Sequence, residues 1–431
     1  LEEAAGRYRH SITLIHTLPA GAERDGHEIA LQLELAAVMG LMHAFSAPAV
    51  GEVYMRTVAL CEQSGEKGDP YAEALHGLAQ HHLSAARFDD AARVATVLLD
   101  HAREAGQPHP EVLAHRALSQ VRFWTGRYTE LWEHSARAME LYDPEAPVEQ
   151  RFAMGIESGV IAMTYGAVGL WALGRPHEAA AMADRCVEHA KRQPDVYQQA
   201  YAQAYLSMLG IMLIDPERVE RWALAAKSIA ERHGFAPLEG LSRYTLAWAM
   251  AERGHPESFD MVVSGIGILA ALGTGIGAPG CMAVVAEMYA KDGQFGEAAG
   301  YVAFGEAMAD GTGQHFYTVE LHRSAALAHL GLADAADDDE VRATELHAAE
   351  QRASAAIDLA RAQSAASLEL RAIQPMIELL CRRGDTEAAR SLLADAVAKF
   401  PAESSGTELD RARAALRGAA ELRPRLRFHE V

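Results

Sequence analysis

The sequence is poor in cysteine and has no long apolar run, and each shortage excludes a class of protein. Its four cysteines, Cys61, Cys186, Cys281 and Cys381, are widely spaced, with no CxxC pair and no histidine at metal-ligand spacing. This argues against a disulfide scaffold or a zinc site and favours a reduced, cytoplasmic setting. No stretch of 18 apolar residues occurs, so no transmembrane helix is predicted. Because Leu1 is not preceded by Met or followed by a secretory leader, we expect a piece of a longer protein.

Positive charge is also scarce. The chain has 39 Lys and Arg against 59 Asp and Glu, a formal net charge of −20. A field of this sign repels phosphate backbones and anionic lipid headgroups. The charge balance therefore predicts neither nucleic acid nor a membrane surface as a partner.

Alanine is abundant where aromatic residues are few. Of 431 residues, 50% are hydrophobic and 23% charged, and 85 are Ala against 11 Phe and 5 Trp. Half-apolar chains of this length bury a large core, and alanine is the best helix former but a poor strand former. The composition predicts an all-α protein.

Short turn signals recur about every forty residues. They fall at Ala86, Gly126, Gly174, Asp215, Gly254, Gly293 and Gly384, in steps of 40, 48, 41, 39, 39 and 91, the last covering two units with one hidden turn. An apolar-periodic stretch precedes each turn, and a second helix is expected to follow it. Five positions after four of the turns, where paired helices cross closely, stand Ala91, Ala179, Ala298 and Ala389.

This is the tetratricopeptide pattern, with an aromatic residue just after the turn at Phe88, Tyr128 and Phe295. It predicts an all-α, right-handed α-solenoid of about eight or nine helical hairpins with a period near 40 residues. We expect one superhelical domain over 1–431, with N-terminal repeats in 1–150, central repeats in 151–313, and C-terminal repeats plus a capping helix in 314–431.

Two stretches depart from the pattern. The acidic segment 333–340 is expected to be a solvated insertion that hides the missing turn. The glycine-rich segment 265–280 is expected to be a flexible joint or an inter-repeat loop with a helix-packing glycine. Its Gly273-x-Gly-x-Gly277 is not read as a nucleotide loop, because a dinucleotide fingerprint requires a preceding strand.

Motifs of catalysis are missing from the sequence. GxxxxGK[ST], HExxH and GxSxG do not occur, and His76 and His81 are five residues apart, which does not place them on one helical face. We therefore expect no catalytic residue, no metal, no cofactor and no enzyme activity in this chain.

The concave surface is the remaining candidate for a binding site. In stacked hairpins the first helices line an inner groove, and aligning the repeats on their turns selects one set of residues. The candidates are His76, Gln80, Arg116, Gln120, Thr164, Trp171, Tyr205, Tyr244, Trp248 and Glu287, with Gln374 and Glu378 further along. Aromatic, amide and arginine side chains are typical of peptide and small-ligand grooves. The alternative is that Trp171, Tyr244 and Trp248 only pack neighbouring repeats together.

Five stretches carry a family resemblance: His27–Leu35, Phe123–Pro144, Tyr165–Ala179, Ala362–Ala372 and Phe400–Leu416. The most specific motifs are Leu-Tyr-Asp-Pro, which ends the second stretch, and Ser-Leu-Glu-Leu-Arg-Ala in the fourth. Together they resemble the C-terminal tetratricopeptide region of bacterial signalling proteins. In these a class III adenylate or guanylate cyclase, or a LuxR-type or winged-helix DNA-binding domain, is joined through a STAND-type ATPase to repeats like those of the maltose regulator.

The resemblance implies a non-catalytic sensor and protein-interaction module. Its groove would bind a partner protein, a peptide or a small effector, and the binding would regulate the upstream ATPase and a cyclase or transcription output. The family's catalytic residues and nucleotide loop have no counterpart in this sequence, so the resemblance implies that they lie upstream of Leu1. The alternative is a stand-alone tetratricopeptide receptor for a peptide or small metabolite of the quorum-sensing type.

Overall fold

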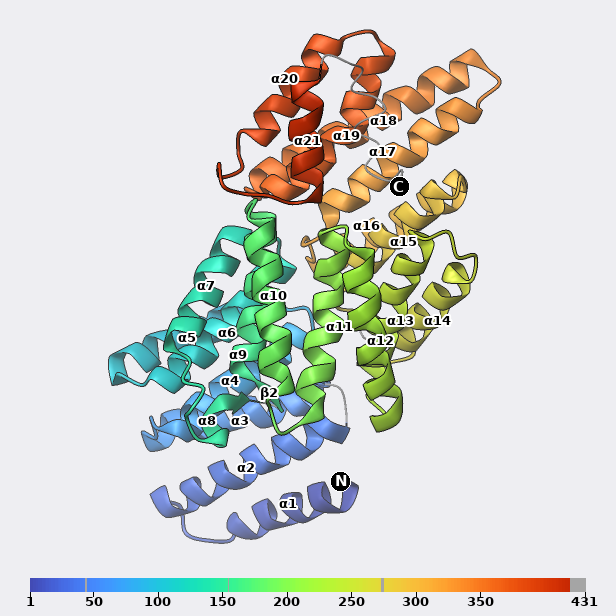
Figure 1. The fold of residues 1–431 in the computed structure, drawn as a ribbon. Helices are drawn as coiled ribbons and strands as arrows, with labels where there is room; N and C mark the ends of the chain where they lie inside the picture. The colour runs from blue at the N-terminus through green and yellow to red at the C-terminus, as the bar shows by residue number, and fades with distance from the viewer. Residues whose placement is uncertain (43–44, 154, 273–274, 419–431) are drawn as a thin grey trace. The chain divides into compact units, whose positions relative to one another are not determined.

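A computed structural model describes residues 1–42, 45–153, 155–272 and 275–418. The described chain is helical almost throughout, and consecutive helices pack as hairpins (Figure 1). Its only strands within these ranges are β1 (Phe152–Ala153) and β2 (Ile156–Glu157), which pair antiparallel over two residues each. The predicted all-α helical-repeat fold is confirmed.

The helices group into two compact units. The first comprises Leu1–Arg122 with Glu133–Ala162, and the second comprises Phe123–Trp132 with the chain from Met163 onward. The first unit contains α1 (Glu2–Ile15), α2 (Ala22–Met42), α3 (Pro48–Ser64), α4 (Asp69–Ser84), α5 (Phe88–Ala105) and α8 (Val148–Arg151), with most of α6 (Pro108–Trp124) and α7 (Tyr128–Leu141).

The second unit begins with the turn between α6 and α7 and continues from within α9 (Ser158–Ala172). Its further helices are α10 (Pro176–Lys191), α11 (Val196–Met212), α12 (Pro216–His233), α13 (Ala236–Ala251), α14 (Ser258–Ala271), α15 (Ala278–Lys291), α16 (Phe295–Thr312), α17 (Thr318–Ala335), α18 (Asp339–Ala362), α19 (Ala366–Arg382), α20 (Thr386–Val397) and α21 (Thr407–Arg417).

Each predicted turn separates two helices and contains a residue with positive φ. These residues are Ala86, Gly126, Gly174, Ile214, Gly254, Gly293 and Gly384, with φ between 51° and 80°. Glycine adopts this conformation without steric cost, which explains its recurrence at this position. The predicted turn positions are confirmed.

The hidden turn lies within the acidic segment, as predicted, and most of the segment is exposed, but it is not an insertion between the two helices. Only residues 336–338 lie outside helices there, because α17 continues to Ala335 and α18 begins at Asp339. The Asp338 side chain accepts hydrogen bonds from the backbone N–H groups of Glu340 and Val341, and so caps α18. The acidic residues thus start a helix, where negative charge is favourable.

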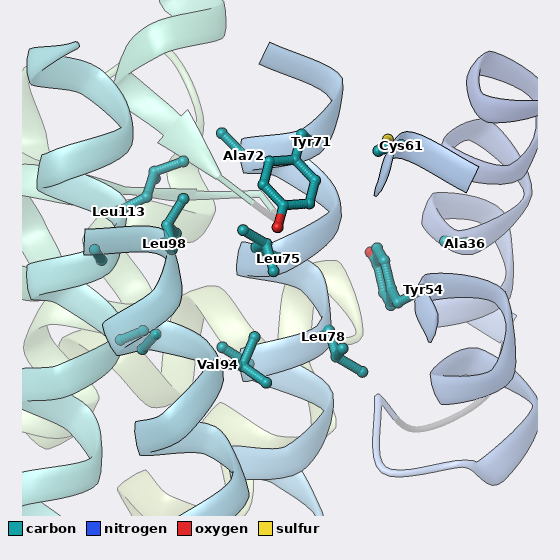
Figure 2. Close-up of a cluster of buried hydrophobic side chains, with 14 of the residues drawn as sticks. Ala36, Tyr54, Cys61, Tyr71, Ala72, Leu75, Leu78, Val94, Leu98 and Leu113 are labelled. Carbon is teal, nitrogen blue, oxygen red and sulfur yellow. The ribbon is translucent and has the colours of Figure 1, made fainter. Parts of the chain in front are cut away.

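The core of the first unit lies between successive hairpins (Figure 2). Tyr54 from α3, Leu75 from α4, Leu98 from α5 and Leu113 from α6 are all buried there. The apolar face of each helix is covered by the neighbouring repeat, which is how a solenoid builds one continuous core.

The glycine-rich segment belongs mainly to helices. Gly265 lies within α14, Gly277 precedes α15, and Gly273 lies outside the described residues. A Cβ on Gly265 would lie 2.8 Å from both the Gly240 carbonyl oxygen and the Tyr244 nitrogen of α13. The absence of a side chain at Gly265 therefore allows the two helices of this hairpin to cross at close range, and the helix-packing reading of this glycine is confirmed.

We expect Gly265→Ala to destabilise the second unit by about 1–3 kcal/mol, because two backbones must separate to admit the methyl group. Gly267→Ala is the matched control on the same helix, since its Cβ would meet no atom within 4 Å. Alanine's higher helix propensity should make this variant about 0.5–1 kcal/mol more stable. Calorimetric melting measures both effects, and stabilisation of both variants would contradict the close crossing.

Candidate functional site

The second unit brings together segments that are far apart in sequence. The turn after α6 packs against the linker between α16 and α17, where the His315 N–H donates to the Trp124 carbonyl oxygen at 2.8 Å. The Tyr128 hydroxyl donates to the Phe316 carbonyl oxygen. The Phe316 ring centroid lies 4.5 Å from that of Phe123 and 5.4 Å from that of Trp124. An aromatic cluster therefore joins residues more than 190 positions apart.

A second contact joins the end of α9 to the last repeat. The Ser367 hydroxyl donates to the Trp171 carbonyl oxygen at 2.5 Å, and the Ser404 hydroxyl donates to the Gly174 carbonyl oxygen at 2.8 Å. Only small cavities remain between these elements. One of about 20 Å³ is lined by Trp171, Met212, Leu370 and Glu408, among others, and has room for about one water molecule.

Five charged side chains form a buried cluster beside these contacts, which we call the ionic cluster. It consists of Glu287 on α15, Glu320 and Arg323 on α17, Arg371 on α19 and Glu408 on α21, each at most 9% exposed. Buried charges are costly unless they are paired and hydrogen-bonded. The cluster therefore links four helices that could otherwise separate.

Arg323 makes the close contacts of the cluster. Its Nε lies 2.7 Å from Glu320 Oε2, and its Nη2 also pairs with Glu287. Burial would lower the pKa of Arg323, but the nearby carboxylates of Glu287 and Glu320 more than offset this and raise it. Arg323 therefore remains charged in the core.

Arg371 is held less closely than Arg323. Its Nε lies 3.2 Å from Glu320 Oε1 and 3.6 Å from Glu408 Oε1, outside good hydrogen-bond geometry. Neither its Nε nor its Nη1 has a hydrogen-bond partner among the described atoms. The guanidinium thus retains unused donors in the interior.

Glu408 is the titratable group of this cluster in the physiological range. Burial raises the pKa of its carboxyl group to about 7, against the opposing effect of Arg371. Without the proton, the cluster holds three carboxylates and two guanidinium groups. With it, the charges of the five cluster residues balance, and Lys291 at the edge of the cluster also pairs with Glu287 at 3.1 Å.

We expect the stability of the second unit to fall as the pH rises from about 4.5 to 7. The folded chain keeps the Glu408 proton up to about pH 7, whereas the unfolded chain releases it near 4.5. The stabilisation is therefore complete below this window and lost above it, by up to about 3 kcal/mol.

The stability of Glu408→Gln should lack the pH dependence that comes from Glu408, because glutamine cannot ionise. The difference in unfolding free energy between wild type and variant, followed across pH, measures this dependence. Burial chiefly lowers the pKa of both His115 and His134 in the first unit to about 4. These two histidines therefore make the stability rise with pH, which is opposite to the effect of Glu408. This contribution cancels in the difference. A difference that is constant from pH 4.5 to 8 would contradict the assignment.

The predicted groove residues of the first unit lie on α4 and α6 and are buried. His76, Gln80, Arg116 and Gln120 are each at most 7% exposed. Gln80 Nε2 donates to Gln120 Oε1 at 2.9 Å, and Arg116 Nη1 donates to the carbonyl oxygen of Ile156 at 3.0 Å. Burial, with Arg116 nearby, lowers the pKa of His76, which favours its neutral form.

The predicted residues of the second unit lie on α9, α11, α13, α15 and α19. Thr164, Trp171, Tyr244, Trp248 and Glu287 are buried, whereas Tyr205, Gln374 and Glu378 are half-buried. The ten principal candidates therefore occupy the first helix of each hairpin, but nine of them face packed interior and not open solvent. Only Glu287 belongs to the ionic cluster.

Four residues of the ionic cluster are absent from the predicted set: Glu320, Arg323, Arg371 and Glu408. For two of them, Arg323 and Arg371, the repeat period of the sequence contains a signal that they belong together. Arg323 and Arg371 are 48 residues apart, as are Ala336 and Gly384 in the turns that follow them. They therefore occupy equivalent positions in adjacent repeats.

No group of three or more His, Cys, Asp or Glu side chains in the described ranges is arranged to hold a metal ion. Within the same ranges, no helix is both long enough and apolar enough to serve as a membrane span. All four cysteines are free thiols, three buried and Cys381 half-buried.

The helical hairpins and their turns define an all-α helical-repeat fold. No protein-family model matches the sequence, and no curated protein matches it. Among solved structures, it is similar to aspartyl phosphate phosphatase F from Bacillus subtilis, at 11% identity over 89% of this chain and 95% of that one, with a TM-score of 0.47. It is also similar to a Rap protein complexed with competence and sporulation factor, at 14% identity over 92% of this chain and 97% of that one, with a TM-score of 0.38. Yeast Tom70 is similar at 12% identity over 97% of this chain and 90% of that one, with a TM-score of 0.37.

Proposed function

We propose that this chain is a non-catalytic sensor and protein-interaction module of a multidomain bacterial signalling protein in the cytoplasm. A partner protein or effector bound by its repeats regulates an upstream STAND-type ATPase, and through it a cyclase or a transcription domain. The family-like motifs support this proposal. One of them, Ser-Leu-Glu-Leu-Arg-Ala, contributes Arg371 to the ionic cluster.

The observation that carries the proposal is the ionic cluster in the last repeats. Glu320, Arg371 and Glu408 lie on three different helices, so separating any one of them takes a charge partner from a buried group. Such a cluster favours discrete arrangements of the repeats over gradual distortion. A ligand that binds one arrangement more tightly than another shifts the population between them, and a sensor needs this property.

Calorimetric titration of this chain with the ATPase module encoded upstream in the same reading frame tests the proposal. We expect binding at micromolar affinity or tighter, with an affinity that differs between the ATP-bound and the nucleotide-free module. No heat of binding in either state, with several domain boundaries, would overturn the proposal. A reading frame that starts close to Leu1 would favour a stand-alone receptor.

A further inference from the structure

The last described helix, α21, lies across the interior contacts of the second unit. Its buried residues are Glu408, Leu409, Ala412 and Ala415. Thr407, Glu408 and Leu409 form one wall of the water-sized cavity. Its other walls come mainly from α9, α11 and α19, together with Pro176 at the start of α10 and Phe400. Helix α21 therefore covers a surface that the preceding repeats build.

The covered surface combines apolar side chains with one charged group. Trp171 on α9, Met212 on α11 and Leu370 on α19 are buried beside α21. At the same place Arg371 presents a guanidinium whose Nε and Nη1 have no hydrogen-bond partner among the described atoms. A better-placed carboxylate could accept both donors in a bidentate pair.

Helix α21 buries few apolar side chains on this surface, and Arg390 of α20 holds its C-terminal end by donating to the Gly418 carbonyl oxygen at 2.7 Å. It has eleven residues, a length at which an isolated helix is marginal in water, and its buried apolar side chains are one leucine and two alanines. Its carboxylate oxygen Glu408 Oε1 lies 3.6 Å from Arg371 Nε. A helix with better contacts could replace it.

We propose that α9, α11 and α19 form a helix-binding groove in which α21 is the resident occupant. A partner protein displaces α21 with an amphipathic helix that has a narrow apolar face and a carboxylate in the place of Glu408. The inference rests on the proposed function, because it takes the partner to be a protein, and it names the surface where that partner binds.

A labelled peptide with the sequence of residues 405–418 serves as the probe, titrated into the full chain. In Ala412→Glu a charge on the buried face of α21 expels the helix, while the sequences of α9, α11 and α19 stay as in wild type. Ala414→Glu adds the same charge on the exposed face two residues later. We expect Ala412→Glu to bind the peptide at least about tenfold more tightly than wild type, and Ala414→Glu to bind like wild type.

Circular dichroism and hydrogen exchange show whether Ala412→Glu folds with α21 released. If it does, and peptide affinity is unchanged, the groove is not a helix acceptor and the proposal is overturned. If this variant does not fold, the same peptide is added in excess to the wild-type chain, with heavy isotopes that distinguish it from the chain. We expect it to accelerate amide exchange in residues 407–417 of the chain. Unchanged exchange would overturn the proposal.

A second copy of the chain is the competing occupant. Light scattering that shows a wild-type dimer, dissociated by Ala412→Glu but not by Ala414→Glu, would overturn the proposal in favour of exchange of α21 between copies. Failure of the peptide experiment leaves the titration with the ATPase module unaffected. The two proposals therefore fail separately.

Discussion

Arg371→Met is expected to destabilise the second unit by about 3–5 kcal/mol. The substitution leaves Glu320 and Glu408 as buried carboxylates with one fewer positive charge in reach, and removing one member of a buried ionic group costs more than the group itself contributes. Differential scanning calorimetry should show a large downward shift in the melting of this unit.

Arg383→Met is the control at the end of the same helix. Arg383 pairs with Glu350 across two distances of 2.8 and 2.5 Å, but the two side chains are 50% and 36% exposed. The loss of an exposed pair should cost less than about 1 kcal/mol. Equal effects of the two substitutions would show that burial of the ionic cluster has no energetic role.

Phe316→Ala is expected to destabilise the second unit by a similar amount, about 3–5 kcal/mol. Phe316 is 1% exposed, and its ring contacts those of Phe123, Trp124 and Tyr317. Truncation removes the centre of the aromatic cluster that closes the second unit. Equilibrium unfolding followed by tryptophan fluorescence measures the loss, since Trp124 adjoins the site.

Phe304→Ala is the matched control, because Phe304 lies on α16 in the same unit and is 58% exposed. Its truncation should change the unfolding free energy by no more than about 0.5 kcal/mol. If Phe304→Ala cost as much as Phe316→Ala, the face of α16 that carries Phe304 would be covered in solution, contrary to its exposure in this structure.

The repeat architecture was predictable because its signals are local. A turn such as Gly126 or Gly174 needs positive φ in its own residue, and Ala91 or Ala179 must be small because the partner helix ends only a few residues earlier. These requirements recur every forty residues whatever the distant contacts are. The sequence predicts one array and does not reveal the division into two units.

The burial of the candidate site was not predictable in this way. Trp171 is covered because Ser367 and the segment around Ser404 pack against the end of α9, about 200 residues later in the chain. Aligning the repeats places every first helix along an open groove. It cannot show that a segment from a distant repeat covers that groove. The equivalent positions of Arg323 and Arg371 were visible, but burial of both became apparent only in the structure.

The ionic cluster gives the proposed sensor a physical basis. Glu408 connects α21 to Arg371, and Arg371 approaches Glu287 and Glu320 on the two preceding repeats. Displacement of α21 removes one carboxylate from this group and changes the charge balance around the others. In the proposed mechanism, occupancy of the groove is therefore coupled to the packing of α15, α17 and α19 through these charges.

Hydrogen exchange of the chain, alone and saturated with the upstream ATPase module, tests the central claim most directly. If binding selects between two arrangements of the repeats, amides of α21 should exchange faster in the complex, and those of α15, α17 and α19 should change their protection. Binding accompanied by unchanged exchange in all four helices would contradict the claim, because the repeats would then be a passive attachment surface.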